Sequence, residues 1–273
     1  MSALAIQLQS FPVGIVEGAP FRLDEERIVF EANHRTLATE LSGAPVWQGK
    51  VPAGGAKVWA LSRVLKQELP ICGREGGFLA LVSKNRGKGG AVPGGTIFYD
   101  RAEKILLEAS QQLRTSGKLS GLGGLIGLGL GLTPSGDDFL VGLLFGRELM
   151  RLSRKEAVVP VDARGIRANL DKTTPAGKSA LLMALEGRFP YYLLELTRAG
   201  DSKIRLGTRD SHQDVWLQEQ HVSLAQAVRS AVDHGETSGT DTLAGVSWYL
   251  DLCRWGKPMD LPVPEPQDNL SLE

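Results

Sequence analysis

The stretch GLGLGLTPSGDDFLVGLLFG, from Gly127 to Gly146, governs how the second half of the chain folds. Glycines at alternating positions let a backbone turn sharply and come close to another group, where any Cβ would obstruct it. The stretch then enters a helix, for which Thr133 or Ser135 can serve as N-cap and Pro134 suits the first helical position. The free N–H groups and the positive dipole end of such a helix start can hold a small anion.

The same pattern recurs near the end of the chain. The segment SGTDTLAG at 238–245 aligns with SGDDFLVG at 135–142, and the first Ser and Gly, the second acidic position, the Leu and the last Gly are identical. Both helices that follow are apolar on nearly all sides, and Gly142 and Gly146 would let a neighbouring helix come close, so we expect both helices at the centre of a bundle. That placement would bring Asp138 and Asp241 towards one pocket.

Two interpretations of these acids stay open. A Ser followed three residues later by an Asp, ahead of an apolar run, is also a capping box in which the Asp serves only its own helix. Asp137 favours a site, because capping does not require a second carboxylate. We therefore expect Asp137 to serve a ligand and Asp138, the partner of Ser135 in the capping box, mainly to secure the helix.

Other parts of the chain argue against cofactors and metals. The segment DKTTPAGKS at 171–179 ends like a phosphate-binding P-loop, but Lys172 replaces the first glycine and no apolar strand leads into it. The alternating glycines do not fit the dinucleotide fingerprint. The four histidines lack metal-ligand spacing. No G-x-S-x-G elbow is present, so Ser135 and Ser238 are expected to be caps or ligand donors. No cofactor and no metal are predicted.

Two further features of the sequence each have two possible explanations. His234 lies near a predicted helix C-terminus, where a dipole contact is the simple role, but it also precedes Ser238 closely enough to act as a proton donor or ligand contact. The loop containing Lys84, Arg86 and Lys88 is basic and glycine-rich. It could close over an anionic substrate, and a solvated hairpin turn explains it equally well.

The first hundred residues read as strands with turns, and the predicted fold class is α+β. The expected lobes are a β-rich lobe at 1–100 and a mainly helical lobe at 101–256, followed by a flexible Pro-rich tail at 257–273. A capping box at Asp100 and Glu103 predicts a helix that stops at Gly117, and Ser223 opens another. The expected N-terminal strands are Val13–Val16, Arg27–Ala32, Phe78–Val82 and Thr96–Tyr99, with one helix at Ala56–Gln67.

Composition limits the partners. Lys plus Arg and Asp plus Glu are 31 each, so no overall charge attracts nucleic acid or an anionic membrane. The apolar segments are interrupted before they could span a bilayer, and no signal sequence precedes them, so a cytoplasmic protein is expected. The two cysteines, Cys72 and Cys253, lie far apart in the sequence and form neither a disulfide framework nor a zinc motif.

With these motifs in view, the chain resembles a bacterial family long catalogued as a domain of unknown function, which includes the AllH subunit of oxamate carbamoyltransferase. The resemblance rests on Gly127–Asp138, on Thr173–Ser179 leading into Leu181, and on Gly235–Leu243, in that order along the chain. The S-T-R-T phosphate signature of ordinary carbamoyltransferases is absent, and the residues from Pro175 to Lys178 depart from the pattern of the middle motif.

The resemblance implies a subunit of a complex in purine or allantoin degradation that interconverts oxalurate plus phosphate with oxamate plus carbamoyl phosphate. The implied partners are therefore one of these small anions and companion subunits. In such a reaction the Gly136 and Gly239 amides could stabilise an oxyanion, and Asp137 or Asp138 could orient or deprotonate the amide. The candidate catalytic residues are Asp137, Asp138 and Asp241, and the candidate ligand-binding residues are Gly129, Gly131, Thr133, Ser135, Gly136, Thr174, Ser179, Thr237, Ser238 and Gly239.

The competing hypothesis is a non-catalytic anion-binding or scaffolding subunit, in which the Gly-rich helix starts serve only packing and assembly. Asp137 is the discriminating feature, because packing does not need it. A stand-alone amidohydrolase is a weaker alternative, since neither a nucleophile with its base nor a metal cluster is found in the sequence.

Overall fold

The computed structural model describes residues 21–23, 27–32, 35–40, 48–52, 58–82, 97–153, 158–199 and 223–255. The described chain is mainly helical and divides into two compact units, Met1–Gln48 and Gly49–Glu273. The expected strand Val13–Val16, the basic loop from Lys84 to Lys88 and the tail 257–273 lie outside the described residues, as do His34, His212 and His221.

The first unit contains a short antiparallel sheet in the order β1-β2-β3. Strand β1 is Phe21–Leu23, β2 is Arg27–Ala32 and β3 is Arg35–Glu40. Arg27 pairs with Glu40 at one end of the second hairpin. The sheet is confined to this short stretch of sequence.

The prediction of a β-rich N-terminal lobe reaching residue 100 is wrong. Helix α1 occupies Val58–Cys72 and helix α2 begins at Ile97, both inside the expected lobe. The expected strand Phe78–Val82 contains a short 3-10 helix, η1, at Leu79–Leu81. A short apolar run does not reveal by its periodicity whether it is a strand or a buried helical turn, and here packing against helices decides for the turn.

Helix α2, Ile97–Ser116, also corrects two local predictions. Ile97 to Tyr99, expected to be a strand, form its first residues. Asp100 therefore lies within the first turn and does not cap the helix. The predicted end is confirmed, because Gly117 follows with a left-handed φ of 68°.

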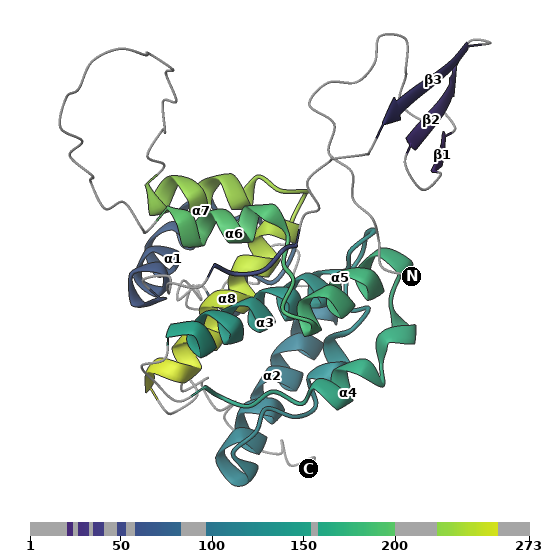
Figure 1. The fold of residues 1–273 in the computed structure, drawn as a ribbon. Helices are drawn as coiled ribbons and strands as arrows, with labels where there is room; N and C mark the ends of the chain where they lie inside the picture. Colours follow the sequence, from purple (N-terminus) through teal and green to yellow (C-terminus); the bar gives the residue numbers. More distant parts are fainter. Residues whose placement is uncertain are drawn as a thin grey trace, which may run out of the picture. The chain divides into compact units, whose positions relative to one another are not determined.

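The remaining elements form a bundle around α3 and α8, which lie side by side at its centre (Figure 1). Helix α3 packs also against α5, and α8 against α1 and α7. No helix in the described ranges is both long and apolar enough to cross a membrane. The elements after α2 are η2 (Leu122–Leu125), α3 (Ser135–Ser153), α4 (Ala163–Arg167), η3 (Leu170–Lys172), α5 (Pro175–Leu185), α6 (Tyr191–Arg198), α7 (Leu224–Val232) and α8 (Ser238–Trp255).

Glycine makes the close contact between α3 and α8 possible. A Cβ on Gly142 would overlap the carbonyl oxygen of Thr242, and a Cβ on Gly245 would overlap that of Phe139. The two contacts are reciprocal. In the alignment of the two motifs, Gly142 of α3 corresponds to Gly245 of α8, and Phe139 corresponds to Thr242. The repeat in the sequence is thus a local two-fold repeat in the structure, and it places the two helix starts together.

Candidate functional site

The starts of α3 and α8 adjoin, as the repeated motif predicts. The hydroxyl oxygens of Thr133 and Ser238 lie 3.1 Å apart across the two helix starts. The Ser238 hydroxyl also lowers the pKa of Asp138 by hydrogen bonding. In the reciprocal contact, the Ser135 hydroxyl lowers the pKa of Asp241 in the same way. Each helix therefore supplies one acid and one serine to a shared polar cluster inside an apolar bundle.

Asp138 is the most unusual group of this cluster. Its side chain is buried, and Oδ2 accepts no hydrogen bond from the residues that the structure describes. Burial is the main cause that raises the pKa of Asp138 to about 7, and the charge of Asp241 adds to it. The hydroxyls of Ser238 and Thr133 lower this pKa, because they donate hydrogen bonds to the charged carboxylate. The carboxyl can therefore take up or release a proton near neutral pH.

Asp241 lies deeper, with no exposed surface. Its Oδ1 accepts a hydrogen bond from the Phe78 amide at 2.5 Å, while Oδ2 has no hydrogen-bond partner in the described part of the chain. Burial raises its pKa, and the Phe78 amide and the hydroxyls of Ser135 and Thr237 lower it. The cluster thus holds two unpaired carboxyl oxygens, which is uncommon for buried polar groups and typical of functional sites.

Asp137 has different surroundings. Oδ1 accepts a hydrogen bond from the Gly127 amide at 2.8 Å, and Oδ2 accepts one from the Thr173 hydroxyl. A Cβ on Gly177 would overlap Oδ2. Burial raises the pKa of Asp137, and both hydrogen bonds lower it. Asp137 therefore joins the glycine loop to the start of α5 through both of its carboxyl oxygens.

The capping expected between Ser135 and Asp138 is absent from the described structure. The carbonyl of Pro134 accepts the Asp137 amide at 2.8 Å and the Asp138 amide at 3.2 Å, so Pro134 occupies the capping position and Ser135 is already helical. The geometry thus favours a division of roles opposite to the one suggested by spacing, with Asp138 facing the polar cluster.

The backbone amides proposed as oxyanion donors are already engaged. The Gly136 amide donates to the Leu128 carbonyl at 2.8 Å, and the Gly239 amide donates to the His234 carbonyl at 2.9 Å. In this arrangement neither is available to an anion. Gly129 and Gly131 have left-handed φ values of 119° and 94°, as a glycine turn requires.

Two further predicted ligand-binding residues, Thr174 and Ser179, belong to the N-cap and the body of α5. Thr174 caps this helix by accepting the Gly177 amide at 3.0 Å, and its hydroxyl donates to the Leu132 carbonyl at 2.5 Å. Ser179 is half-buried within the same helix. Thr174 therefore supports the glycine loop from the α5 side.

The structure adds Tyr192 of α6, which no motif in the sequence indicates. The Tyr192 hydroxyl lies 3.2 Å from that of Thr242, and its ring stacks on the exposed His234 ring with centroids 4.3 Å apart. Burial is the main cause that raises the pKa of Tyr192, and the charge of Asp138 contributes. Tyr192 therefore lies between the acids and His234, and no spacing rule connects α6 with these motifs.

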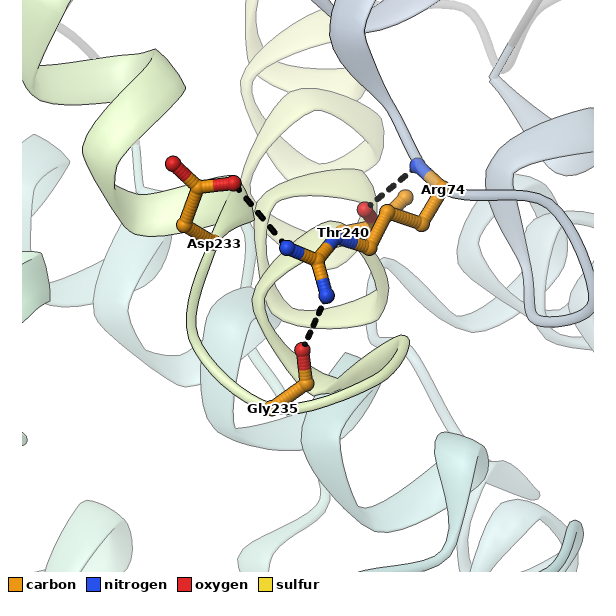
Figure 2. A network of polar contacts seen from close by, with 4 residues as sticks. All are labelled: Arg74, Asp233, Gly235 and Thr240. Carbon is orange, nitrogen blue, oxygen red and sulfur yellow. Dashed lines mark hydrogen bonds and ion pairs between the residues drawn. The ribbon is translucent and has the colours of Figure 1, made fainter.

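A loop between α1 and η1 covers the first turn of α8. The Arg74 amide donates to the Thr240 hydroxyl at 2.9 Å, and its guanidinium donates to the Gly235 carbonyl and to Asp233 (Figure 2). The Gly76–Gly77 pair could have signalled this close approach, because a Cβ on Gly77 would overlap Asp241. Within the described ranges, no three His, Cys, Asp or Glu side chains gather in a way that could hold a metal ion.

A comparison with protein families gives a match over the part of the chain that contains both helix starts. The model of a family described as oxamate carbamoyltransferase subunit AllH matches residues 125–250. The resemblance inferred from the motifs is thereby confirmed for this segment, which includes both helix starts and the intervening chain. No curated protein and no solved structure matches the chain.

Proposed function

We propose that this chain is a subunit of a carbamoyltransferase that acts on a small amide such as oxamate, together with companion subunits. The family match over residues 125–250 supports this class of reaction, because it coincides with the segment that carries the buried acids. The specific reaction proposed is carbamoyl transfer between carbamoyl phosphate and oxamate, which yields oxalurate and phosphate and can run in reverse.

The observation that carries the proposal is the carboxyl of Asp138, with one unpaired oxygen and a pKa raised to about 7. As the amide nitrogen of oxamate attacks the carbamoyl carbon, the new C–N bond forms and the bond from that carbon to the phosphate oxygen breaks. Phosphate leaves with the electron pair, and the proton of the attacking nitrogen passes to Asp138. A general base is most effective when its pKa lies near the working pH.

His234 is our proposed contact for the anionic end of the substrate. The amides of Gly136 and Gly239 are engaged within the chain, so an anion needs another donor. The His234 ring is exposed beside Tyr192, and an imidazole ring can donate a hydrogen bond to an anion through a ring N–H. This arrangement replaces the helix N-terminal amides as the proposed anion contact.

The test compares Asp138→Asn with Asp251→Asn in the complex purified with its companion subunits. Asp251 is a matched control, because it is a buried acid of α8 whose Oδ1 also lacks a well-aligned hydrogen bond in the described part of the chain, but whose charge is met by the Lys66 ammonium at 2.6 Å. Phosphate release from carbamoyl phosphate in the presence of oxamate is measured. Asp138→Asn should lower kcat by about 100-fold or more, the usual contribution of a general base, while Asp251→Asn retains activity. Full activity in Asp138→Asn would favour the scaffolding role instead.

A further inference from the structure

Arg74 connects three parts of the molecule at the start of α8. Figure 2 shows its side chain reaching from the loop after α1 to the turn between α7 and α8. The guanidinium donates to the Gly235 carbonyl at 2.8 Å and to the Asp233 carboxylate at 3.0 Å, and the Arg74 amide donates to the Thr240 hydroxyl at 2.9 Å. One residue thus fastens the loop to both sides of the helix start.

The same loop holds one of the two central acids. Four residues after Arg74, the Phe78 amide donates to Oδ1 of Asp241. The Phe78 ring anchors the loop from the other side, because it packs against Phe139 of α3 with ring centroids 5.8 Å apart. The backbone of Gly77 lies directly against the Asp241 carboxyl, where no Cβ would fit. The loop is therefore fixed at both ends, with Asp241 held at the Phe78 end.

We infer that Arg74 is a positioning residue that keeps the Phe78 amide on Asp241 and so fixes how the Asp241 carboxyl is presented to Asp138. The inference rests on the proposed function for its catalytic consequence, but the positioning itself is a property of this chain alone. Arg74 and Phe78 both lie outside the segment 125–250 that matches the family, so this device is assigned by the structure.

The energetic argument separates positioning from general stability. The ion pair between Arg74 and Asp233 is solvent-exposed on both sides, and pairs of this kind stabilise a protein little. The Phe78 hydrogen bond is buried and goes to a carboxylate, which is the stronger type. Removing the arginine side chain should thus cost little stability overall. It should loosen the loop that carries the strong bond, because the backbone amide at position 74 and the Phe78 ring are then its remaining anchors among the contacts described above.

The first readout is a carboxyl-carbon NMR titration of the full chain. Losing an N–H donor raises the pKa of a carboxyl. The groups that act on Asp241 are the Phe78 amide, Ser135 and Asp138 of α3, and Thr237 beside its own helix. Arg74→Ala should therefore shift the apparent pKa values of the Asp138 and Asp241 pair upwards.

Arg229→Ala is the matched control, because Arg229 also ties α7 to α1 through an exposed guanidinium, in its case to Glu68 at 2.8 Å. It should leave the titration unchanged. Arg74→Lys should restore it in part, because a lysine can still reach one acceptor. An unchanged titration in Arg74→Ala, or an equal shift in Arg229→Ala, overturns the inference. If Arg74→Ala does not fold, Asp233→Asn provides the milder variant, which should shift the titration in the same direction.

The second readout is carbamoyl transfer by the complex. Arg74→Ala should lower kcat by about tenfold through misplacement of the pair, with the acid limb of the pH profile moved upwards and a smaller change in KM. A shifted titration with unchanged activity would retain the positioning role and refute the catalytic role of the acid pair. The two proposals can therefore fail separately.

Discussion

Asp137 and Asp138 show how neighbouring residues of one type acquire different tasks. They project about 100° apart around α3, so they cannot face the same partners. Asp137 meets the Gly127 amide and the Thr173 hydroxyl, while Asp138 meets two hydroxyls and a second carboxyl. The first set of contacts satisfies a buried acid, and the second leaves part of its hydrogen-bonding capacity unused.

Asp137→Ala should lower the free energy of unfolding by about 1 to 3 kcal/mol, because it leaves two partly buried donors without their acceptor. Thr173→Val should have a smaller effect, since it removes one of the two hydrogen bonds. Urea denaturation measures both. An unchanged denaturation midpoint in Asp137→Ala would show that the carboxylate does not tie the glycine loop to α5.

The pKa of Asp138 predicts a dependence of stability on pH. The folded chain raises this pKa from 3.8 to about 7, so the folded state holds the proton more tightly than the unfolded state. The carboxyl therefore reduces stability progressively as the pH rises between these two values, and fully above them. Asp138→Asn removes this titration. The variant should melt at a higher temperature than the parent at pH 8, and the difference should shrink towards pH 4. An equal difference at both pH values would contradict the raised pKa.

At this scale the sequence predicts which residue types meet, but not what each one does. The repeated Ser, Gly and Asp pattern correctly predicted that the two helix starts adjoin. It could not assign the roles of Asp137 and Asp138, because Thr173 and Phe78 reach these acids only through tertiary packing. Spacing alone made Ser135 a cap, whereas in the structure Pro134 takes that place.

At the scale of elements, the contact between α3 and α8 depends on glycine at two aligned positions. Backbone carbonyls occupy the space where side chains at Gly142 and Gly245 would begin. Carbonyl groups within a helix cannot move aside without breaking their hydrogen bonds. The close approach brings Asp138 and Asp241 within electrostatic reach of each other, so helix packing and site geometry are one feature.

Gly142→Ala and Gly245→Ala should each destabilise the protein by about 3 kcal/mol or more, because the two helices must separate to admit a methyl group. Gly146→Ala is the matched control on the same face of α3. Its Cβ would lie 3.3 Å from the Tyr249 ring and 3.4 Å from the Val246 carbonyl oxygen, so it requires a shift of only a few tenths of an ångström, and alanine favours a helix by about 1 kcal/mol over glycine. Thermal melting separates the two cases. Similar melting temperatures for all three variants would contradict the close packing.

The N-terminal elements show where sequence patterns mislead. Ile97, Phe98 and Tyr99 favour a strand by their intrinsic preferences, yet they begin a helix of 20 residues. A long amphipathic helix gains its stability from packing along its whole length, which outweighs the preference of one turn. The predicted helix at Ala56–Gln67 was close to α1, because its apolar spacing continues over several turns.

At the scale of the molecule, the candidate site lies entirely within one of the two compact units. Its acids, hydroxyls and covering loop come from residues between Arg74 and Thr242, and the main apolar cluster begins at Val51. The equal numbers of acidic and basic residues contain no information on where the two units divide. Turn-rich composition suggested a boundary near residue 100, whereas the compact units divide after Gln48.

The last prediction follows from this division. A chain that starts at Gly49 should fold and keep its helical circular dichroism and melting temperature, because the described apolar cluster and the candidate site belong to the second unit. The carboxyl titration of the Asp138 and Asp241 pair should also remain unchanged, since the groups that act on it are all retained. The full chain measured under the same conditions is the reference. Loss of the cooperative transition would contradict this assignment, and so would a shift of the titration with the fold intact. The second result would mean that the first 48 residues contribute to the electrostatics of the site.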